Sequence, residues 1–362
     1  MADNSQSSGT IPHDPRRVNM NDRAAWLAQV QEAIVEPALP ICDPHHHLWD
    51  YPHNRYLLDE LLADIGSGHN VVSTVFMECA SMYREDGPEA LKPVGETEFV
   101  NGVAAMSASG TYGPSRLCAA IVGFADLTLG EAVGAVLDAH RAASPRFVGI
   151  RHASGWDSSP LVRNSHTNPS EHLLADPVFR TGLEELGKRG MSFDAWLYHP
   201  QIGDLVELAR AFPEQRIVFD HFGGPLGIGP YEGRRAEIFA QWKRDVTELA
   251  RHPNVVAKLG GLVMPINGFD FHKAARPATS EEIVNATRDY YLHMIDCFGP
   301  ARCMFESNFP VDKSSCSYAV LWNAFKRLVS DFSESDKRDL FHDTAARTYG
   351  LPTLAAAEGQ PA

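Results

Sequence analysis

The sequence lacks several features that define whole classes of protein. No uninterrupted apolar run among its 362 residues reaches membrane-spanning length, and residues 1–21 are polar with no apolar core like that of a signal peptide. The formal net charge is −14 and no basic stripe occurs, which argues against nucleic acid as a partner. The six cysteines include no CxxC pair. These absences predict a reduced, cytoplasmic, enzyme-like globular protein without a membrane or nucleic-acid partner.

Short apolar runs alternate with helix-compatible segments along the chain. Apolar runs without hydrophobic/polar alternation suit parallel strands that are buried on both faces. Eight strands alternating with helices predict a single (β/α)8 barrel. The rival, a doubly wound open sheet, predicts a Gly-rich phosphate turn after the first strand, and none is present. The expected strands are 41–42, 71–77, 117–122, 147–150, 191–197, 216–219, 255–259 and 303–305, and the clearest expected helices are 129–142, 177–189, 201–211, 238–251 and 281–297.

The chain divides into three parts. Residues 1–36 are expected to form an N-terminal extension, disordered or arm-like at first, with a short helix over 21–34. Residues 37–351 form the barrel, and residues 352–362 a flexible tail. The arm favours a homo-oligomer, with a dimer as the expected state.

Two long segments are expected to be loops at the rim of the barrel. Residues 154–176 follow the fourth strand and residues 260–280 follow the seventh. Loops of this length in a compact barrel often cover the substrate or contact another subunit, so these two should set the size of the substrate.

The first expected strand ends in Asp43-Pro44-His45-His46-His47. In an extended chain Asp43, His45 and His47 lie on one face and His46 on the other. Two imidazoles at this spacing can point into one cavity, and neutral imidazole is both a metal ligand and the usual acid/base group near neutral pH. The alternative is a histidine-rich surface turn.

Reactive or charged side chains also follow most of the other expected strands. The C-terminal ends of the strands meet at one rim, where barrel enzymes carry their active sites. A single Arg, Lys or His at a strand end has an ordinary structural explanation, but their joint placement predicts an enzyme active site. The residues are Glu78, Arg151, His152, Trp196, Tyr198, His199, Asp220, His221, Lys258, Glu306, Asn308 and Asp312.

Five sequence blocks, in this order and spacing, resemble the amidohydrolase-2 branch of the amidohydrolase superfamily. The resemblance is strongest to its sugar-lactonase and pyrone-dicarboxylate-lactonase group and runs from about residue 41 to residue 351. It implies a (β/α)8 barrel that hydrolyses a lactone, ester or amide of a small carboxylated or sugar-like compound. The blocks are Asp43-Pro-His45-His46-His47, Gly149-Ile-Arg151, Asp220-His221-Phe-Gly223, Lys258-Leu-Gly-Gly261 and Glu306-Ser-Asn308-Phe-Pro310-Val.

The resemblance implies roles for individual residues. His45 and His47 match a pair that binds metal in some members and polarises the substrate carbonyl directly in metal-free lactonases. His221 matches a carbonyl-polarising or metal-adjacent histidine, and Arg151 matches an arginine that holds a substrate carboxylate or hydroxyl. The remaining expected substrate-facing residues are Trp196, Tyr198, Glu78 and His152.

One position departs from the family pattern. The eighth strand usually ends in Gly-Ser-Asp-Trp-Pro, where the aspartate is the general base, but here the matching residue is Asn308. A neutral amide cannot accept that proton, although it can orient water or donate a hydrogen bond to an oxyanion. Glu306 shares its face of the strand and is the expected base. The alternative for Glu306 is a buried ion pair with Lys258 or Arg151, and the reserve bases are Asp312, His199 and Glu78.

The residue types that bind zinc are present in the sequence. Zinc needs about three protein ligands and an open position, which His45, His47 and one of His199, His221 or Glu78 would supply. Without the eighth-strand aspartate the usual metal cage of the family is incomplete. The expected cofactor is therefore none or one divalent metal, with zinc the first choice, and metal-independent hydrolysis is favoured.

The expected reaction is attack of water on a lactone or carboxylic-ester carbonyl that is polarised by His45, His47 and His221. Arg151 would anchor the substrate, Asn308 would orient the water, and Glu306 or a nearby histidine such as His199 would take the proton. Three alternatives stay open: an amide hydrolase, a zinc-dependent decarboxylase of an aromatic acid, and a non-catalytic binding barrel.

Overall fold

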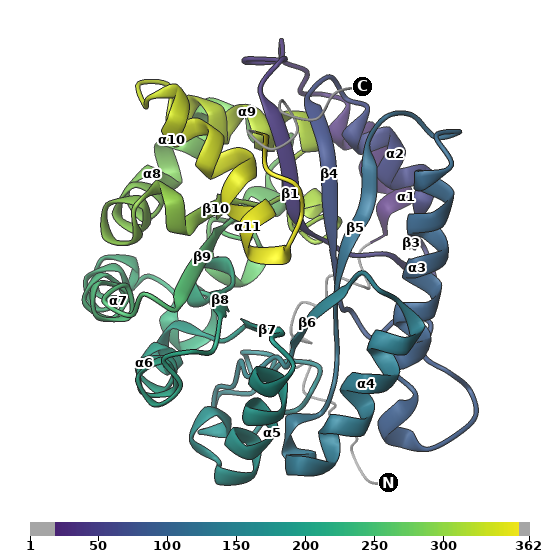
Figure 1. Ribbon diagram of the computed structural model, residues 1–362. Helices are drawn as coiled ribbons and strands as arrows, with labels where there is room; N and C mark the ends of the chain where they lie inside the picture. The colour runs from purple at the N-terminus through teal and green to yellow at the C-terminus, as the bar shows by residue number, and fades with distance from the viewer. Residues whose placement is uncertain (1–18, 355–362) are drawn as a thin grey trace, which may run out of the picture.

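Eight parallel strands form the centre of the protein (Figure 1). The computed structural model describes residues 19–354, so most of the expected N-terminal arm and C-terminal tail lies outside the described residues. The strands pair in chain order, as expected for a (β/α)8 barrel. They are β1 (Pro40–His46), β4 (Asn70–Met77), β5 (Arg116–Gly123), β6 (Phe147–Arg151), β7 (Ser192–Ala195), β8 (Ile217–Phe219), β9 (Val255–Leu259) and β10 (Cys303–Phe305).

The segment that follows β10 closes the barrel against β1. The His47 N–H donates to Phe309 O at 2.8 Å, and the Asn308 N–H donates to His45 O at 2.9 Å. Asp43 Oδ1 accepts the Ser307 N–H at 2.9 Å. Because these bonds fix the backbone after β10 beside the histidine motif, residues 260 positions apart in the chain share one wall of the rim.

Helices surround the strands (Figure 1). All eight expected strands are present, and the five expected helices correspond to α4–α8 with ends that shift by a few residues. The sequence analysis did not anticipate the hairpin β2 (Trp49–Tyr51) and β3 (Asn54–Tyr56), or the helices α2, α3, α9 and α10. The helices are α1 (Met20–Leu27), α2 (Leu58–Ile65), α3 (Val94–Ala108), α4 (Val133–Ala143), α5 (Pro177–Lys188), α6 (Ile202–Ala211), α7 (Arg235–Leu249), α8 (Ser280–Phe298), α9 (Tyr318–Leu328), α10 (Glu334–Arg338) and α11 (Thr344–Tyr349).

The N-terminal helix is shorter than expected. It ends at Leu27, whereas the sequence predicted a helix over 21–34. The segment after it is held by tertiary hydrogen bonds: Glu32 Oε1 accepts the Ser280 N–H, and the Val35 N–H donates to Asn323 Oδ1, both at 2.8 Å. These bonds replace the helical ones and draw the chain across α8 and α9. The role of the arm in an oligomer stays a prediction.

The inside of the barrel is apolar at its lower end. Cys42, Val75, Val122, Val218 and Met304 pack together there, all fully buried. This layer excludes water from beneath the rim, so charged groups that enter the lumen from the rim lie in a medium of low polarity. No helix among residues 19–354 is both long and apolar enough to cross a membrane.

A buried histidine in α4 makes the fold sensitive to acid. His140 is 0% exposed, with Nδ1 2.8 Å from Thr97 Oγ1 and Nε2 3.0 Å from Phe124 O. Burial lowers its pKa to about 4, although the hydrogen bond to Phe124 O acts in the opposite direction. Because this pKa lies below the ordinary value of 6.5, the buried neutral imidazole makes its full contribution to the stability of the folded state above pH 6.5. That contribution is lost as the pH falls towards 4, because the unfolded chain binds a proton that the folded state does not.

We expect His140→Gln to lose less stability than the wild type on acidification. Between pH 7 and pH 4 the wild type should lose on the order of 3 kcal/mol more than this variant, as measured by urea unfolding followed by circular dichroism. His172, whose side chain is 67% exposed, provides the control, and His172→Gln should keep the acid sensitivity of the wild type. If the free energy of unfolding had the same pH dependence in the wild type and in His140→Gln, His140 would not be the source of the acid sensitivity.

Candidate functional site

The histidine motif at the end of β1 sends its side chains in the expected directions. His45 Nε2 and His47 Nε2 lie 3.3 Å apart, and both residues are buried. His46 points to the other side, with Nε2 2.9 Å from Thr74 Oγ1. The third residue of the expected face, Asp43, has a structural role, because its two oxygens accept hydrogen bonds from the Ser307 N–H and the Tyr318 hydroxyl, each at 2.9 Å.

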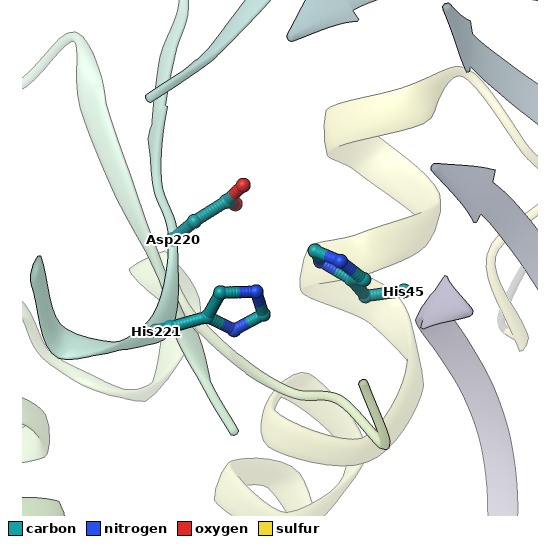
Figure 2. A group of neighbouring side chains, drawn as sticks. All are labelled: His45, Asp220 and His221. Carbon is teal, nitrogen blue, oxygen red and sulfur yellow. The ribbon is translucent and has the colours of Figure 1, made fainter. Parts of the chain in front are cut away.

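Glu306 joins histidines from opposite walls of the barrel. Its Oε1 lies 2.6 Å from His221 Nδ1, and its Oε2 lies 2.8 Å from His45 Nδ1. Figure 2 shows Asp220 and His221 facing His45 from the segment after β8. His221 approaches Gly261 so closely that a Cβ there would lie 2.5 Å from its Nδ1, so only glycine fits beside this ring. Glu306 therefore orients His221 through a hydrogen bond and lies within ion-pair distance of His45.

Lys258 places a positive charge under this group. Its Nζ lies 2.9 Å from Asp194 Oδ2, 3.3 Å from Asp220 Oδ1 and 3.9 Å from Glu306 Oε2, and the side chain is 0% exposed. The ion pair considered for Glu306 in the sequence is thus present at long range, while Asp194 is the nearer partner. Lys258 is a common counter-ion for three buried carboxylates.

Arg151 is committed to Glu78. Its Nε donates to Glu78 Oε1 at 2.7 Å and its Nη2 donates to Glu78 O at 2.6 Å, which leaves Nη1 at 3.3 Å from His45 Nε2. The other oxygen of Glu78 lies 3.1 Å from His166 Nε2. Glu78 thus occupies the Nε/Nη2 edge of the guanidinium, and the role of Arg151 in holding a substrate carboxylate or hydroxyl stays a prediction.

Burial dominates the proton affinities at the site. It raises the pKa of Glu306 to about 8 even though Lys258 acts to lower it. It lowers the pKa of His221 to about 3 and holds the pKa of His45 and of His47 well below 6.5. The three histidines are therefore neutral near pH 7, while Glu306 has a high affinity for a proton.

A cavity of about 150 Å³ opens above these groups. Six of the expected site residues line it, together with two groups from the long loops. His45, Glu306 and Glu78 are not among the lining residues and support the wall from behind. The lining residues are His47, Trp49, Cys79, Arg151, Arg163, Asn164, Ser165, His166, Trp196, Tyr198, His221, Met264, Ile266, Asn308 and Val311.

Two expected site residues lie away from this cavity. His152 Nδ1 accepts the Leu127 N–H at 3.2 Å, and its ring packs between Phe124 and Phe179. His199 Nδ1 accepts the Leu226 N–H, also at 3.2 Å. Both imidazoles accept hydrogen bonds from backbone groups of rim loops. Their positions therefore do not support His152 as a substrate-binding residue or His199 as a base.

Asn308 lines the cavity with its amide held from one side. Its Nδ2 donates to Asp312 Oδ1 at 3.1 Å, and Asp312 Oδ2 accepts the Gly261 N–H at 3.1 Å. This arrangement leaves the Asn308 amide oxygen as an acceptor. Asp312, a reserve base in the sequence, is buried behind Asn308 and orients it instead.

Three residues of the site were not anticipated. Asp194 lies inside the apolar run of β7, and an acidic residue within an otherwise apolar buried strand was a signal that could have identified it. Arg163 and His166 come from the loop after β6, where no local pattern in the sequence marks them. Only the folded loop brings them to the cavity.

The donor set fits a divalent cation. The ligand atoms of His45, Asp220 and His221 lie within 4.8 Å of one another, and His47 lies next to His45. Among the described residues, neither oxygen of the buried Asp220 accepts a hydrogen bond. Within residues 19–354, four buried carboxyl groups (Glu78, Asp194, Asp220 and Glu306) face two permanent cations, Arg151 and Lys258, so positive charge is in deficit when all four are ionised.

The chain is similar to known proteins over most of its length. The family model described as amidohydrolase matches residues 42–351. The chain is 34% identical over 334 residues to the uncharacterized protein y4mH of Sinorhizobium fredii, which covers 86% of this chain and 98% of that protein. It is 25% identical over 321 residues to an L-fucono-1,5-lactonase of Burkholderia multivorans, covering 87% and 97%.

Solved structures show the same fold. An amidohydrolase from Burkholderia multivorans with bound zinc has a TM-score of 0.66 at 24% identity, covering 86% of this chain and 99% of that chain. A 2-pyrone-4,6-dicarboxylic acid hydrolase from Pseudomonas putida, described as putative in that structure, has a TM-score of 0.59 at 18% identity, covering 86% and 98%. The extent of the family match, with the y4mH relationship, is decisive: the chain belongs to the amidohydrolase family and is a hydrolase.

Proposed function

We propose that the protein hydrolyses the lactone of a small organic acid. The single observation that carries the proposal is the Glu306–His221 contact at the floor of a small cavity, where a carboxylate orients a neutral imidazole that lines the pocket. A carboxylate that accepts the Nδ1 proton of an adjacent histidine fixes its tautomer and leaves the other ring nitrogen with a lone pair for a proton. Two relatives named L-fucono-1,5-lactonase, at 25% and 26% identity, support an internal ester as the substrate.

His221 is placed to move the proton of the attacking water. With its Nδ1–H directed at Glu306 Oε1, its Nε2 carries the lone pair that accepts a proton from water. Glu306, which is ionised above a pKa that burial raises to about 8, then takes the Nδ1 proton, so the relay requires the ionised carboxylate. The relay avoids a lasting charge on a buried imidazole, whose protonation is unfavourable here. Glu306 thus acts through His221 rather than on water directly, as had been expected.

We place the carbonyl oxygen of the substrate near Arg151. Its Nη1 is not bound by Glu78 and lies 3.3 Å from His45 Nε2, and Arg151 lines the cavity together with His47. A charged donor held in place before the reaction stabilises the oxyanion that forms as water attacks. The Asn308 amide oxygen accepts a hydrogen bond from the water and turns its lone pair towards the carbonyl carbon.

The size of the cavity restricts the substrate. Ligand pockets commonly enclose roughly 300–1,000 Å³, and this cavity encloses about 150 Å³. A single-ring lactone suits that space, with Trp196 and Tyr198 as apolar walls. The amide hydrolase and the aromatic-acid decarboxylase remain alternatives; carbon dioxide release from hydroxybenzoates would favour the decarboxylase.

His221 and Glu306 should behave as one unit. On a panel of five- and six-membered lactones, His221→Asn should lower kcat by about 10² or more, and Glu306→Gln should lower it less because the imidazole remains. The double variant should be no slower than His221→Asn, because the carboxylate works only through the ring.

The half-exposed His293 of α8 provides the control for this comparison, and His293→Asn should keep the wild-type kcat. Multiplicative losses in the double variant would show that Glu306 and His221 act independently. An unchanged kcat in His221→Asn would show that His221 is not the general base.

We also propose that the site binds one divalent cation, which revises the preference for metal-independent hydrolysis. His45 and Asp220 belong, with His221, to the group whose ligand atoms lie within 4.8 Å of one another. They would hold the ion together with His47, whose Nε2 lies 3.3 Å from His45 Nε2, and His221 would be left to transfer the proton. When bound, such an ion supplies positive charge that polarises a carbonyl and makes water more acidic.

The expected metal content is one zinc per chain after dialysis against micromolar zinc, measured by plasma mass spectrometry. His47→Asn and Asp220→Asn should each reduce it, and thermal unfolding should shift upwards with zinc in the wild type but not in these variants. His293→Asn tests the surface pair of His293 and Cys297, 3.4 Å apart, as a competing zinc site. Stoichiometric zinc that survives both active-site substitutions would contradict the assignment.

A further inference from the structure

The last residue of α11 reaches the charged groups of the site from the apolar layer inside the barrel. Tyr349 is 1% exposed and packs in the layer that contains Val218. Its hydroxyl donates to Asp194 Oδ2 at 2.6 Å. The helix is held in this place, because Arg216 Nη1 donates to Thr348 O at 2.8 Å. Tyr349 therefore connects the C-terminal helix to a carboxylate beneath the rim.

One oxygen of Asp194 is shared between this hydroxyl and Lys258. Lys258 Nζ donates to the same Oδ2 atom at 2.9 Å and lies 5.5 Å from the centre of the Tyr349 ring. From this position Nζ also lies 3.3 Å from Asp220 Oδ1 and 3.9 Å from Glu306 Oε2. Asp194 thus holds the cation that the other two carboxylates share.

The hydroxyl decides how the charge of Lys258 is divided. A hydrogen bond donated to a buried carboxylate stabilises its ionised form. With the hydroxyl in place, part of the negative charge of Asp194 is compensated by Tyr349, so that Lys258 also serves Asp220 and Glu306. Without the hydroxyl, Asp194 attracts the ammonium more strongly, and the ammonium moves away from the other carboxylates.

We infer that Tyr349 is a positioning residue of the site, whose hydroxyl acts through Asp194 to keep the ammonium of Lys258 in place. The inference rests on the proposed function, because this ammonium faces Glu306, the carboxylate that orients the proposed base. Tyr349 is not among the residues that line the cavity, so it acts on the reaction without contact with the substrate. The C-terminal helix is thereby part of the catalytic machinery.

A second group of the same composition provides a matched control. The Tyr56 hydroxyl donates to Asp64 Oδ2 at 2.8 Å, and Lys313 Nζ donates to the same oxygen at 2.7 Å. Lys313 Nζ lies 5.2 Å from the centre of the Tyr56 ring, and Tyr56 is also 1% exposed. These three residues are not among those that line the cavity. Tyr56→Phe therefore removes an equivalent hydrogen bond outside the site.

The first test is kinetic, with the lactone that the wild type hydrolyses fastest. Tyr349→Phe keeps the ring and its packing, and it should lower kcat by about tenfold, the effect of one lost hydrogen bond to a charged group, with KM changed by less than about twofold. Tyr56→Phe should lower the midpoint of thermal unfolding by a similar amount and keep the wild-type kcat. In the Asp194→Asn background, Tyr349→Phe should cause no further loss of kcat. Equal kcat in Tyr349→Phe and Tyr56→Phe would overturn the inference.

Nuclear magnetic resonance without substrate separates this inference from the proposed function. The protein is labelled at the lysine side-chain nitrogen, and the signals of the two ammonium groups are assigned with Lys258→Arg and Lys313→Arg. The Lys258 signal should shift in Tyr349→Phe only, and the Lys313 signal in Tyr56→Phe only. If no lactone is hydrolysed but Lys258 responds in this way, the proposed reaction is wrong and the coupling of Tyr349 to Lys258 stands. If the Lys258 signal is the same in the wild type and in Tyr349→Phe, the inference is wrong even when lactones are hydrolysed.

Discussion

The carboxylate of Glu306 contacts His221 on one wall of the barrel and His45 on another, and the rest of the site depends on this bridge. Each contact uses the Nδ1 atom of an imidazole; the hydrogen bond to His221 orients that ring, whereas His45 also contacts Lys258 through Nδ1 and both His47 and Arg151 through Nε2. The bridge requires a carboxylate in an apolar lumen, where an isolated charge is costly. Lys258, itself fully buried, provides the compensating charge from below.

The bridge forms only because the barrel closes. Asn308 N–H to His45 O and His47 N–H to Phe309 O join the chain after β10 to β1, and Asp43 supports the same seam through Ser307. The closure brings Glu306 beside the histidine motif and places Asn308 at the cavity. A second charge network, from Arg151 through Glu78 to His166, ties the floor of the site to the loop after β6. The floor of the cavity and the loop after β6 are thus parts of one hydrogen-bonded structure.

Two arginines of the cavity lining come from different segments of the chain. Arg151 is held by Glu78 at two nitrogens, which makes it a rigid donor towards the floor. Arg163 lies on the loop after β6 and lines the same cavity. The site thereby combines a wall of positive charge with an interior rich in carboxylates.

The order of apolar runs in the sequence by itself determined the eight strands and the (β/α)8 barrel, because strands buried on both faces need uninterrupted apolar residues. The HxH spacing likewise determined that His45 and His47 point to one side, because side chains alternate along an extended chain. The sequence also located most residues at the rim. Only the tertiary structure decided which of them act together. It set Glu306 behind His221, bound Arg151 to Glu78, turned His152 and His199 towards backbone groups, and brought Arg163 to the cavity. These outcomes depend on contacts between residues far apart in the chain and on the burial of charge, and neither is encoded in a local pattern.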